Sequence, residues 1–205
     1  YPENFIGIQT YSGGYNALEG AEHYAYMGQK FRGVCGSSYI NRTTLLESYY
    51  KEIKDLVEML KDGACADVSA TATYAKPDKS AIRVTAESTF GFDASDEDFR
   101  LAFVLLEDKV GPYTQDNSFY SNPSAPDDSN DWLNEWRHND SQVTMMYDNV
   151  LRGVYSDDQG IAGSLPSTVE KGKTYHYEFT FSVPIPQYSN ITYNKDNYRV
   201  VALLI

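Results

Sequence analysis

The sequence predicts an α+β fold, in which a helix-containing segment over residues 1–63 precedes a strand-rich domain over residues 64–205. Two observations indicate this division. Apolar residues recur at spacings of three and four between residues 46 and 60, which is the period of one helical face. After Gly63 the period changes to two, which is the period of a strand. We therefore expect the domain boundary to lie near Gly63.

The first segment is expected to contain one well-defined helix. Thr44 and Glu47 have the spacing of a capping box, which satisfies backbone N–H groups at a helix N-terminus. Gly63 follows the last apolar position and is a typical helix end. The elements expected before this helix are a strand over residues 5–11, a short helix over residues 19–31 and a short strand at residues 39–40.

The second segment is expected to form an antiparallel β-sandwich. Apolar and polar side chains alternate in residues 68–74 and again in residues 82–87, which is typical of a hairpin with one exposed face. Residues 143–147 and 151–155 fit either two strands or a strand and a short turn. The remaining strands are expected over residues 101–106, 175–183 and 198–205. Several short strands separated by turns are typical of a sandwich.

Charge and the length of apolar runs argue against a nucleic-acid partner and against a membrane span. The chain has a net charge of -12, and residues 64–205 carry most of it, with eleven basic and twenty-one acidic side chains. Such a surface repels phosphate backbones, so a nucleic-acid partner is not expected. The longest apolar runs, Leu101–Leu106 and Val200–Ile205, are far shorter than the roughly 20 residues of a spanning helix, so no membrane span is expected. Any export signal would precede Tyr1.

A long connection between residues 112 and 142 is a candidate contact surface. It is rich in Asn, Asp, Ser and Pro, and loops of this length are usually functional or disordered. Its aromatic residues, which are the candidate binding residues, are Phe119, Tyr120, Trp132 and Trp136. These rings could anchor a protein or stack on a sugar. The alternative is that they fold back and cover one end of the sandwich.

The sequence contains no catalytic motif. Cys35, in a glycine-flanked loop, is the one candidate redox residue, whereas Cys65 is expected in the core at the domain junction. The three histidines lie far apart, and His176 is expected on the exposed face of its strand. Two acidic clusters, at residues 93–98 and 127–131, contain oxygen ligands suited to calcium but lack the EF-hand pattern, so ordinary solvated turns are favoured. No metal and no cofactor is therefore assigned.

Short motifs along the chain resemble a known family when they are taken in order. They are residues 1–11, Gly36–Arg42, Asp67–Tyr74, Asn149–Gly153, Gly163–Pro166 and Arg199–Ala202. Together they are similar to the outer membrane protein 28-related family, a group of exported, lipid-anchored or surface proteins of Gram-negative bacteria. The resemblance covers most of the chain.

The resemblance implies an incomplete thioredoxin-like segment at residues 1–63 followed by an immunoglobulin-like sandwich at residues 64–205. In family members with a redox motif, a Cys-x-x-Cys pair precedes the segment that corresponds to Tyr1, and a proline stands near Cys35. This sequence has neither feature. The resemblance further implies a location in the outer membrane, in the periplasm or outside the cell, and any lipid anchor would lie upstream of residue 1.

The favoured function is a non-catalytic exported binding or interaction protein of the outer-membrane-associated type. Its contact face would comprise the sandwich and the 112–142 loop, and its partner would be a protein or a glycan at the cell surface. The alternative is an envelope thiol–disulfide oxidoreductase whose Cys-x-x-Cys lies upstream of residue 1. A purely structural surface protein is the third hypothesis. A fold by itself does not choose among them, because one scaffold carries many functions.

Overall fold

The computed structural model of this chain describes residues 38–40, 44–46, 64–117, 120, 138–156, 159–186 and 191–205. Over these residues the named elements are ten strands and one short 3-10 helix. The described part of the chain is thus almost entirely β-structure, and the predicted α+β class is wrong.

The predicted helix that begins at Thr44 is replaced in its first turn by a strand. β1 (Ser38–Ile40) and β2 (Thr44–Leu46) pair in antiparallel fashion, with Ile40 opposite Thr44. The backbone of β2 bonds across to β1 and therefore cannot make the bonds along the chain that a capping box begins. Pairing with a neighbouring strand overrides the local helix signal. The thioredoxin-like α/β segment expected over residues 1–63 is accordingly not supported.

One element expected in this first segment is confirmed, because the strand predicted at residues 39–40 is part of β1. The strand expected at residues 5–11, the helix expected at residues 19–31 and the rest of the helix expected up to Gly63 lie outside the described residues. The domain boundary near Gly63 stays a prediction.

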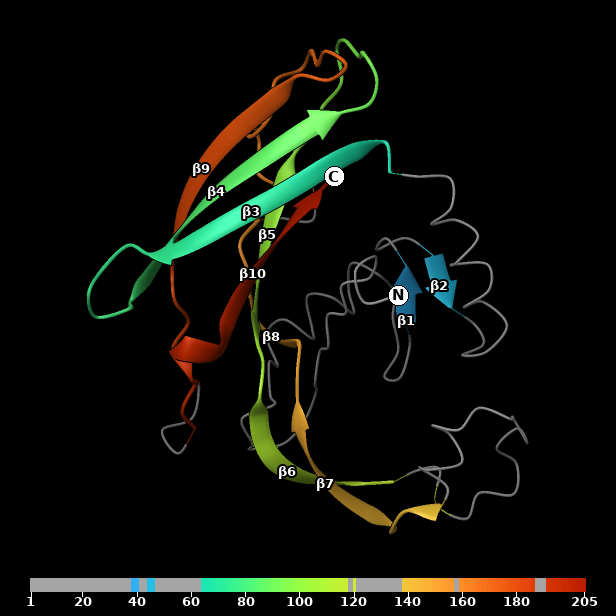
Figure 1. Cartoon of the computed structure of the whole chain (residues 1–205), viewed down its shortest axis with the longest axis vertical. Coiled ribbons are helices and arrows are strands. Elements are labelled where there is room, and N and C mark those ends of the chain that lie inside the picture. The colour runs from blue at the N-terminus through green and yellow to red at the C-terminus, as the bar shows by residue number, and fades with distance from the viewer. Residues whose placement is uncertain are drawn as a thin grey trace.

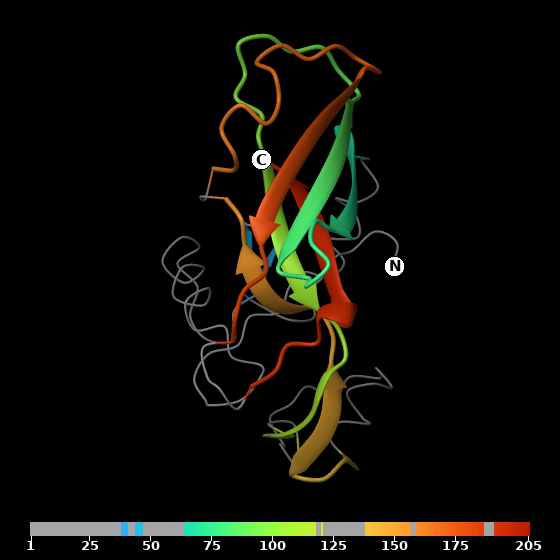
Figure 2. The ribbon, with the colours of Figure 1, turned by 90° about the vertical axis from the view of Figure 1, so that its left-hand side faces the viewer.

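The remaining described residues are built around two antiparallel sheets. The first has the order β3-β4-β9 and contains β3 (Ala66–Tyr74), β4 (Ala81–Phe90) and β9 (Thr174–Ser182). The second has the order β10-β5-β8 and contains β5 (Leu101–Glu107), β8 (Val150–Val154) and β10 (Tyr198–Leu204). The two sheets lie face to face as a sandwich (Figure 1, Figure 2). The strands predicted beyond Gly63 are confirmed, with small shifts at their ends.

The core lies between the two sheets. Side chains from β4, β5 and β9 form its centre, and β4 supplies Ile82, Val84 and Ala86 from alternate positions. β5 is buried along its whole length, because its other face packs against a second apolar cluster with β8 and β10. This explains why its sequence is apolar at every position from Leu101 to Leu106 rather than alternating.

One lateral side of the sandwich is closed by an aromatic contact between the sheets. The ring of Tyr155, which follows β8, stacks on that of Phe181 in β9 with 3.7 Å between centroids. The Tyr155 hydroxyl donates to the Ser182 carbonyl oxygen over 3.0 Å. This contact joins the outer strand of one sheet to the outer strand of the other.

A buried ion pair lies where β5 ends and β8 begins. Arg152 Nε donates to Glu107 Oε2 over 2.6 Å, and both side chains are almost fully buried. The register shifts beside Arg152, so this residue sits in a β-bulge that redirects its side chain. Glu107 Oε1 also accepts the N–H of Asn194 over 2.6 Å, and the Tyr193 ring covers the guanidinium at 4.1 Å. A buried charge pair needs such additional partners to be stable.

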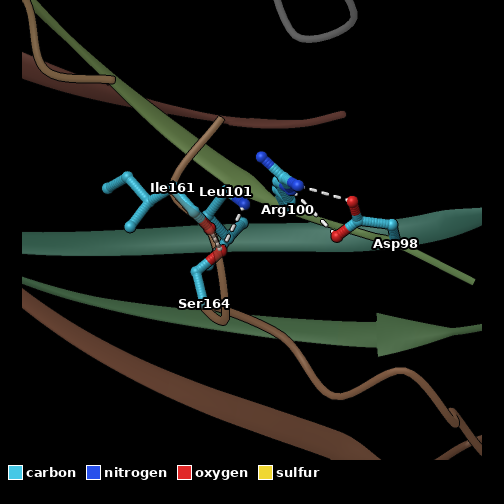
Figure 3. A network of polar contacts seen from close by, with 5 residues as sticks. All are labelled: Asp98, Arg100, Leu101, Ile161 and Ser164. Carbon is cyan, nitrogen blue, oxygen red and sulfur yellow. Dashed lines mark hydrogen bonds and ion pairs between the residues drawn. The ribbon is translucent and has the colours of Figure 1, made fainter. Parts of the chain in front are cut away.

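At the other end of β5, one serine organises a turn (Figure 3). The Leu101 N–H donates to Ser164 Oγ over 2.7 Å, and the Ser164 hydroxyl donates to the Ile161 carbonyl oxygen over 2.7 Å. Arg100 and Asp98 form a two-bond ion pair next to this turn, with distances of 2.8 and 2.6 Å. Ser164 therefore satisfies a backbone group that has no ladder partner at the start of β5.

Candidate functional site

A two-stranded arm extends from the sandwich and carries the loop that sequence analysis selected. β6 (Val110–Asp116) continues from β5 and pairs with β7 (Gln142–Tyr147), which leads into β8. Figures 1 and 2 show this pair, called the arm from here on, projecting beyond the two sheets. The predicted 112–142 loop was therefore too long, because residues 112–116 and 142 belong to strands. The sequence signal for β6 is weak, since Gly111 and Pro112 occur near its start.

A reciprocal pair of hydrogen bonds fixes the point where the arm leaves the sandwich. The Lys109 N–H donates to Asp148 Oδ1 over 2.9 Å, and the Asn149 N–H donates to Asp108 Oδ1 over 2.7 Å. Lys109 and Asn149 both have positive φ, at 57° and 60°. Each strand thus bends at a left-handed residue that is tied to the aspartate of the opposite strand. We call these four residues the clasp.

The clasp is anchored to the body of the sandwich by one arginine of β10. Arg199 Nε donates to Asp108 Oδ2 over 3.2 Å, and its Nη2 donates to Asn149 Oδ1. A single guanidinium therefore contacts both strands of the bend, which suits its planar array of donors. This network lies next to the buried Glu107, at the junction of arm and sandwich.

The two faces of the arm differ in polarity. On one face Tyr113 lies opposite Met145, and both pack against the buried cluster of Val110, Tyr147 and Val150. On the other face a Thr114–Thr144 pair, with 2.6 Å between hydroxyl oxygens, is followed by a bond of 3.0 Å from Gln142 Nε2 to Asp116 Oδ1. The second face is exposed and presents hydroxyl, amide and carboxylate groups to solvent.

The base of the loop is closed at the tip of the arm. The Asn117 N–H donates to the Ser141 carbonyl oxygen over 2.8 Å, and its side-chain amide donates to the Asp140 carbonyl oxygen over 3.1 Å. Tyr120 is the one predicted contact residue that the structure describes, and its side chain is 49% exposed. Phe119, Trp132 and Trp136 lie outside the described residues. The contact role of these four aromatic residues therefore stays a prediction.

The predicted core position of Cys65 is wrong, because this residue is exposed. The Cys65 carbonyl oxygen accepts the Gly91 N–H, so the residue extends the ladder of β3. Alternation along that strand gives Cys65 the same orientation as Asp67 and Ser69, toward solvent. Cys35, the candidate redox residue, lies outside the described residues.

The polar residues considered for other chemistry have structural partners. His176 is exposed, as predicted, and its Nδ1 lies 3.4 Å from Glu87 Oε1. In the acidic cluster at residues 93–98, Asp93 accepts the Lys171 N–H while Asp98 binds Arg100, whose guanidinium lowers the Asp98 pKa. The described residues contain no group of acidic, His or Cys side chains suited to a metal ion. The second acidic cluster, at residues 127–131, lies outside them.

Sequence reasoning missed the clasp, although a signal for it exists. Asp108-Lys109 and Asp148-Asn149 each follow an apolar strand segment and precede another one. Aspartate accepts backbone hydrogen bonds in turns, and asparagine tolerates left-handed φ. Two such dipeptides inside otherwise continuous strands predict a pair of bends, but the sequence does not show that the two bends face each other.

No helix within the described residues is long and apolar enough to cross a membrane. Comparison with protein-family models, curated proteins and solved structures finds no match to this chain.

Proposed function

We propose that this chain is a non-catalytic binding protein of the bacterial cell envelope and that its contact surface is the arm with the loop between Asn117 and Ser141. The observation that carries the proposal is the clasp. It holds the arm at a defined angle and is itself held by Arg199 of the sandwich. The base of the loop, at Asn117 and Ser141, is thereby held on the arm, and binding loops usually stand on a rigid scaffold of this kind. The location in the envelope rests on the sequence resemblance.

The chemistry of the arm suits a protein or a glycan partner. Tyr120 and Met146 are large, apolar and exposed, at 49% and 45%. Tyrosine provides contact area with little loss of conformational freedom, and aromatic rings are enriched among the residues that dominate interfaces. The exposed Thr, Gln and Asp side chains of the polar face would supply the surrounding hydrogen bonds.

The test replaces residues 118–139 with two glycines. Asn117 and Asp140 are already joined by a hydrogen bond of 3.1 Å, so a two-residue turn can close the hairpin. We expect the variant to be at least as stable as the parent. Each halving of loop length lowers the entropic cost of closing the loop by about 0.6 kcal/mol. Capture of ligands from an immobilised glycan panel and from a cell-envelope extract should be lost, and each captured molecule is then purified and its Kd measured.

Point variants separate a contact role from a general effect of the loop. Tyr120→Ala and Met146→Ser should weaken the measured Kd, about tenfold or more for a residue that anchors the contact. Ile185→Ser is the matched control, because Ile185 is also apolar and is 88% exposed outside the arm. Unchanged affinity in the variant that lacks residues 118–139 would contradict the proposal.

A further inference from the structure

The outer edge of β10 has no partner strand among the described residues. Among the strands that the structure describes, β10 is the terminal strand of its sheet and pairs only with β5. The Arg100 N–H donates to the Ile205 carbonyl oxygen over 3.0 Å, and the Ile205 N–H donates to the Arg100 carbonyl oxygen over 2.9 Å. This hydrogen-bonded pair fixes which residues of β10 bond to β5. By the alternation of an antiparallel pair, residues 199, 201 and 203 bond inward to β5. The N–H and C=O groups of Val200, Ala202 and Leu204 therefore point outward, whereas the Tyr198 N–H bonds to the Lys195 carbonyl oxygen.

The sequence along this edge is unusually apolar. Residues 200–205 are six consecutive apolar residues without a charge or a proline. Proteins protect exposed sheet edges with charged side chains, prolines, bulges or a covering segment, because such edges pair readily with other chains. β10 has Arg199 as its only charged residue, and that side chain is engaged in the clasp. Within the described part of the chain, this edge thus lacks the usual protection at Val200–Leu204.

The facing sheet carries small, exposed side chains on the side where this edge lies. β3 and β10 lie at the same side of the sandwich (Figure 2) and approach each other. At one end they are joined, because the Tyr74 hydroxyl donates to the Lys195 carbonyl oxygen. Farther along β3, Ala70 and Ala72 occupy core-facing positions by alternation but are exposed. On β10, Val200, Ala202 and Leu204 pack on the core and are only half-buried.

From these observations the geometry points to a second binding surface: the outer edge of β10 accepts an extended segment of a partner polypeptide as an added strand. The outward N–H and C=O groups of β10 alternate along the strand. The C=O and N–H groups of an extended peptide can therefore form hydrogen bonds with them. Its inward side chains would cover Ala70 and Ala72, so large apolar residues at alternate positions fit best. This surface is separate from the arm and does not depend on the function proposed for it.

Charge further defines the partner. The chain has a net charge of -12, and most of this lies beyond Gly63. Opposite charges on two partners accelerate association and favour the correct complex. We therefore expect basic residues on both sides of the apolar stretch in the added strand.

The test uses a fluorescent peptide of about seven alternating valine and threonine residues, with lysines at both ends. Binding to the full chain is measured by anisotropy, and amide hydrogen exchange is followed in the same samples. We expect saturable binding and slower exchange of the Val200, Ala202 and Leu204 amides, with unchanged exchange at β9. A peptide with glutamates in place of the lysines should bind more weakly, and the difference should shrink at high salt.

Two proline variants locate the contact. Ala202→Pro removes one outward N–H of β10 and should weaken peptide binding about tenfold or more. Thr180→Pro is the matched control. Val183 N–H bonds inward to Ser80, so by alternation the Thr180 N–H points away from β4 at the edge of β9. This variant should bind the peptide as the parent does. If Ala202→Pro fails to fold, the exchange measurement on the unmodified chain still decides.

Three results would overturn the proposal. The lysine-flanked peptide could fail to bind or could leave the β10 amides unprotected. These amides could already be protected in the chain without peptide, which would mean that the edge is paired by the protein's own chain. Finally, concentration-dependent self-association that Ala202→Pro abolishes would show that a second copy is the occupant.

Discussion

At the scale of single residues, two buried polar sites in the described part of the chain support the fold. Ser164 accepts from the Leu101 N–H and donates to the Ile161 carbonyl oxygen, and the pair of Glu107 and Arg152 is buried at the end of β5. Ser164 belongs to a motif on which the sequence resemblance depends, and so does Arg152. In the structure, Ser164 stabilises the turn at the start of β5, and Arg152 neutralises the buried Glu107 at its end.

Ser164→Ala should destabilise the protein by about 1–3 kcal/mol, because it leaves the buried Leu101 N–H without its acceptor. Denaturant-induced unfolding monitored by circular dichroism measures this change. Ser69→Ala, on the exposed face of β3, is the control and should shift stability by less than about 0.5 kcal/mol. Equal effects of the two substitutions would show that the Ser164 bonds do not contribute.

Two tyrosines should make the protein sensitive to alkaline pH. Burial raises the pKa of Tyr155 and of Tyr198 above the usual value of 10.0. Below pH 10 both states keep these protons, and above it the unfolded chain loses them first. Stability should therefore fall as pH rises beyond about 10, by up to about 1.4 kcal/mol per pH unit for each group. Urea unfolding between about pH 8 and pH 11 measures the slope.

Phenylalanine substitutions separate the two tyrosines at neutral pH. The buried Tyr198 hydroxyl has no hydrogen-bond partner in the described part of the chain, so Tyr198→Phe should be neutral or stabilising. Tyr155→Phe loses the bond to the Ser182 carbonyl oxygen and should destabilise by about 0.5–1.5 kcal/mol. Each substitution should also reduce the alkaline slope, and an unaltered slope in both variants would refute this explanation.

At the scale of elements, the arm depends on the clasp for its direction. Asp108→Ala and Asp148→Ala together remove the acceptors of the Asn149 and Lys109 N–H groups. We expect hydrogen exchange in β6 and β7 to accelerate, while β4 and β5 keep their protection, because the arm opens locally with little effect on the core. Asp116→Ala, on the exposed face of the arm, is the control. Uniform acceleration in all strands would contradict a local role.

The left-handed conformation of the clasp can be tested independently. Lys109 has a φ of 57°, where glycine is unstrained and a β-branched residue is disfavoured. Lys109→Gly should therefore leave the unfolding free energy unchanged or raise it slightly, whereas Lys109→Val should lower it by about 1–2 kcal/mol. The opposite order of stabilities would show that the bend is not held in this conformation.

At the scale of the whole molecule, the two proposed surfaces lie on different parts of the same sandwich. The arm leaves the end of the sandwich at Asp108 and Asn149, whereas the β10 edge runs along its side. The two surfaces should therefore act independently. Replacement of residues 118–139 should leave the affinity for the lysine-flanked peptide unchanged, and Ala202→Pro should leave capture by the arm unchanged. Anisotropy and capture assays on both variants measure this, and mutual effects would instead indicate one shared surface.

Sequence periodicity predicted the strands of residues 64–205 other than β6, because burial on one face imposes a period of two. The alternation in Ile82–Ala86 and the fully apolar Leu101–Leu106 each have the burial that their patterns indicate. The same kind of reasoning failed at Thr44–Leu46, where a capping-box spacing lies in a strand. The core position predicted for Cys65 was also wrong. This residue continues the alternation of β3, which places it on the same exposed face as Asp67.

The sequence by itself thus determined the segments beyond Gly63 that become strands, except β6, since local alternation records which side chains face the core. The tertiary structure alone decided which segments pair and what their ends contact. Asp108 and Asp148 are 40 positions apart but form one clasp, and the open edge of β10 exists only because no described strand lies beside it. Such features depend on contacts between distant segments, which leave no periodic signal in either segment.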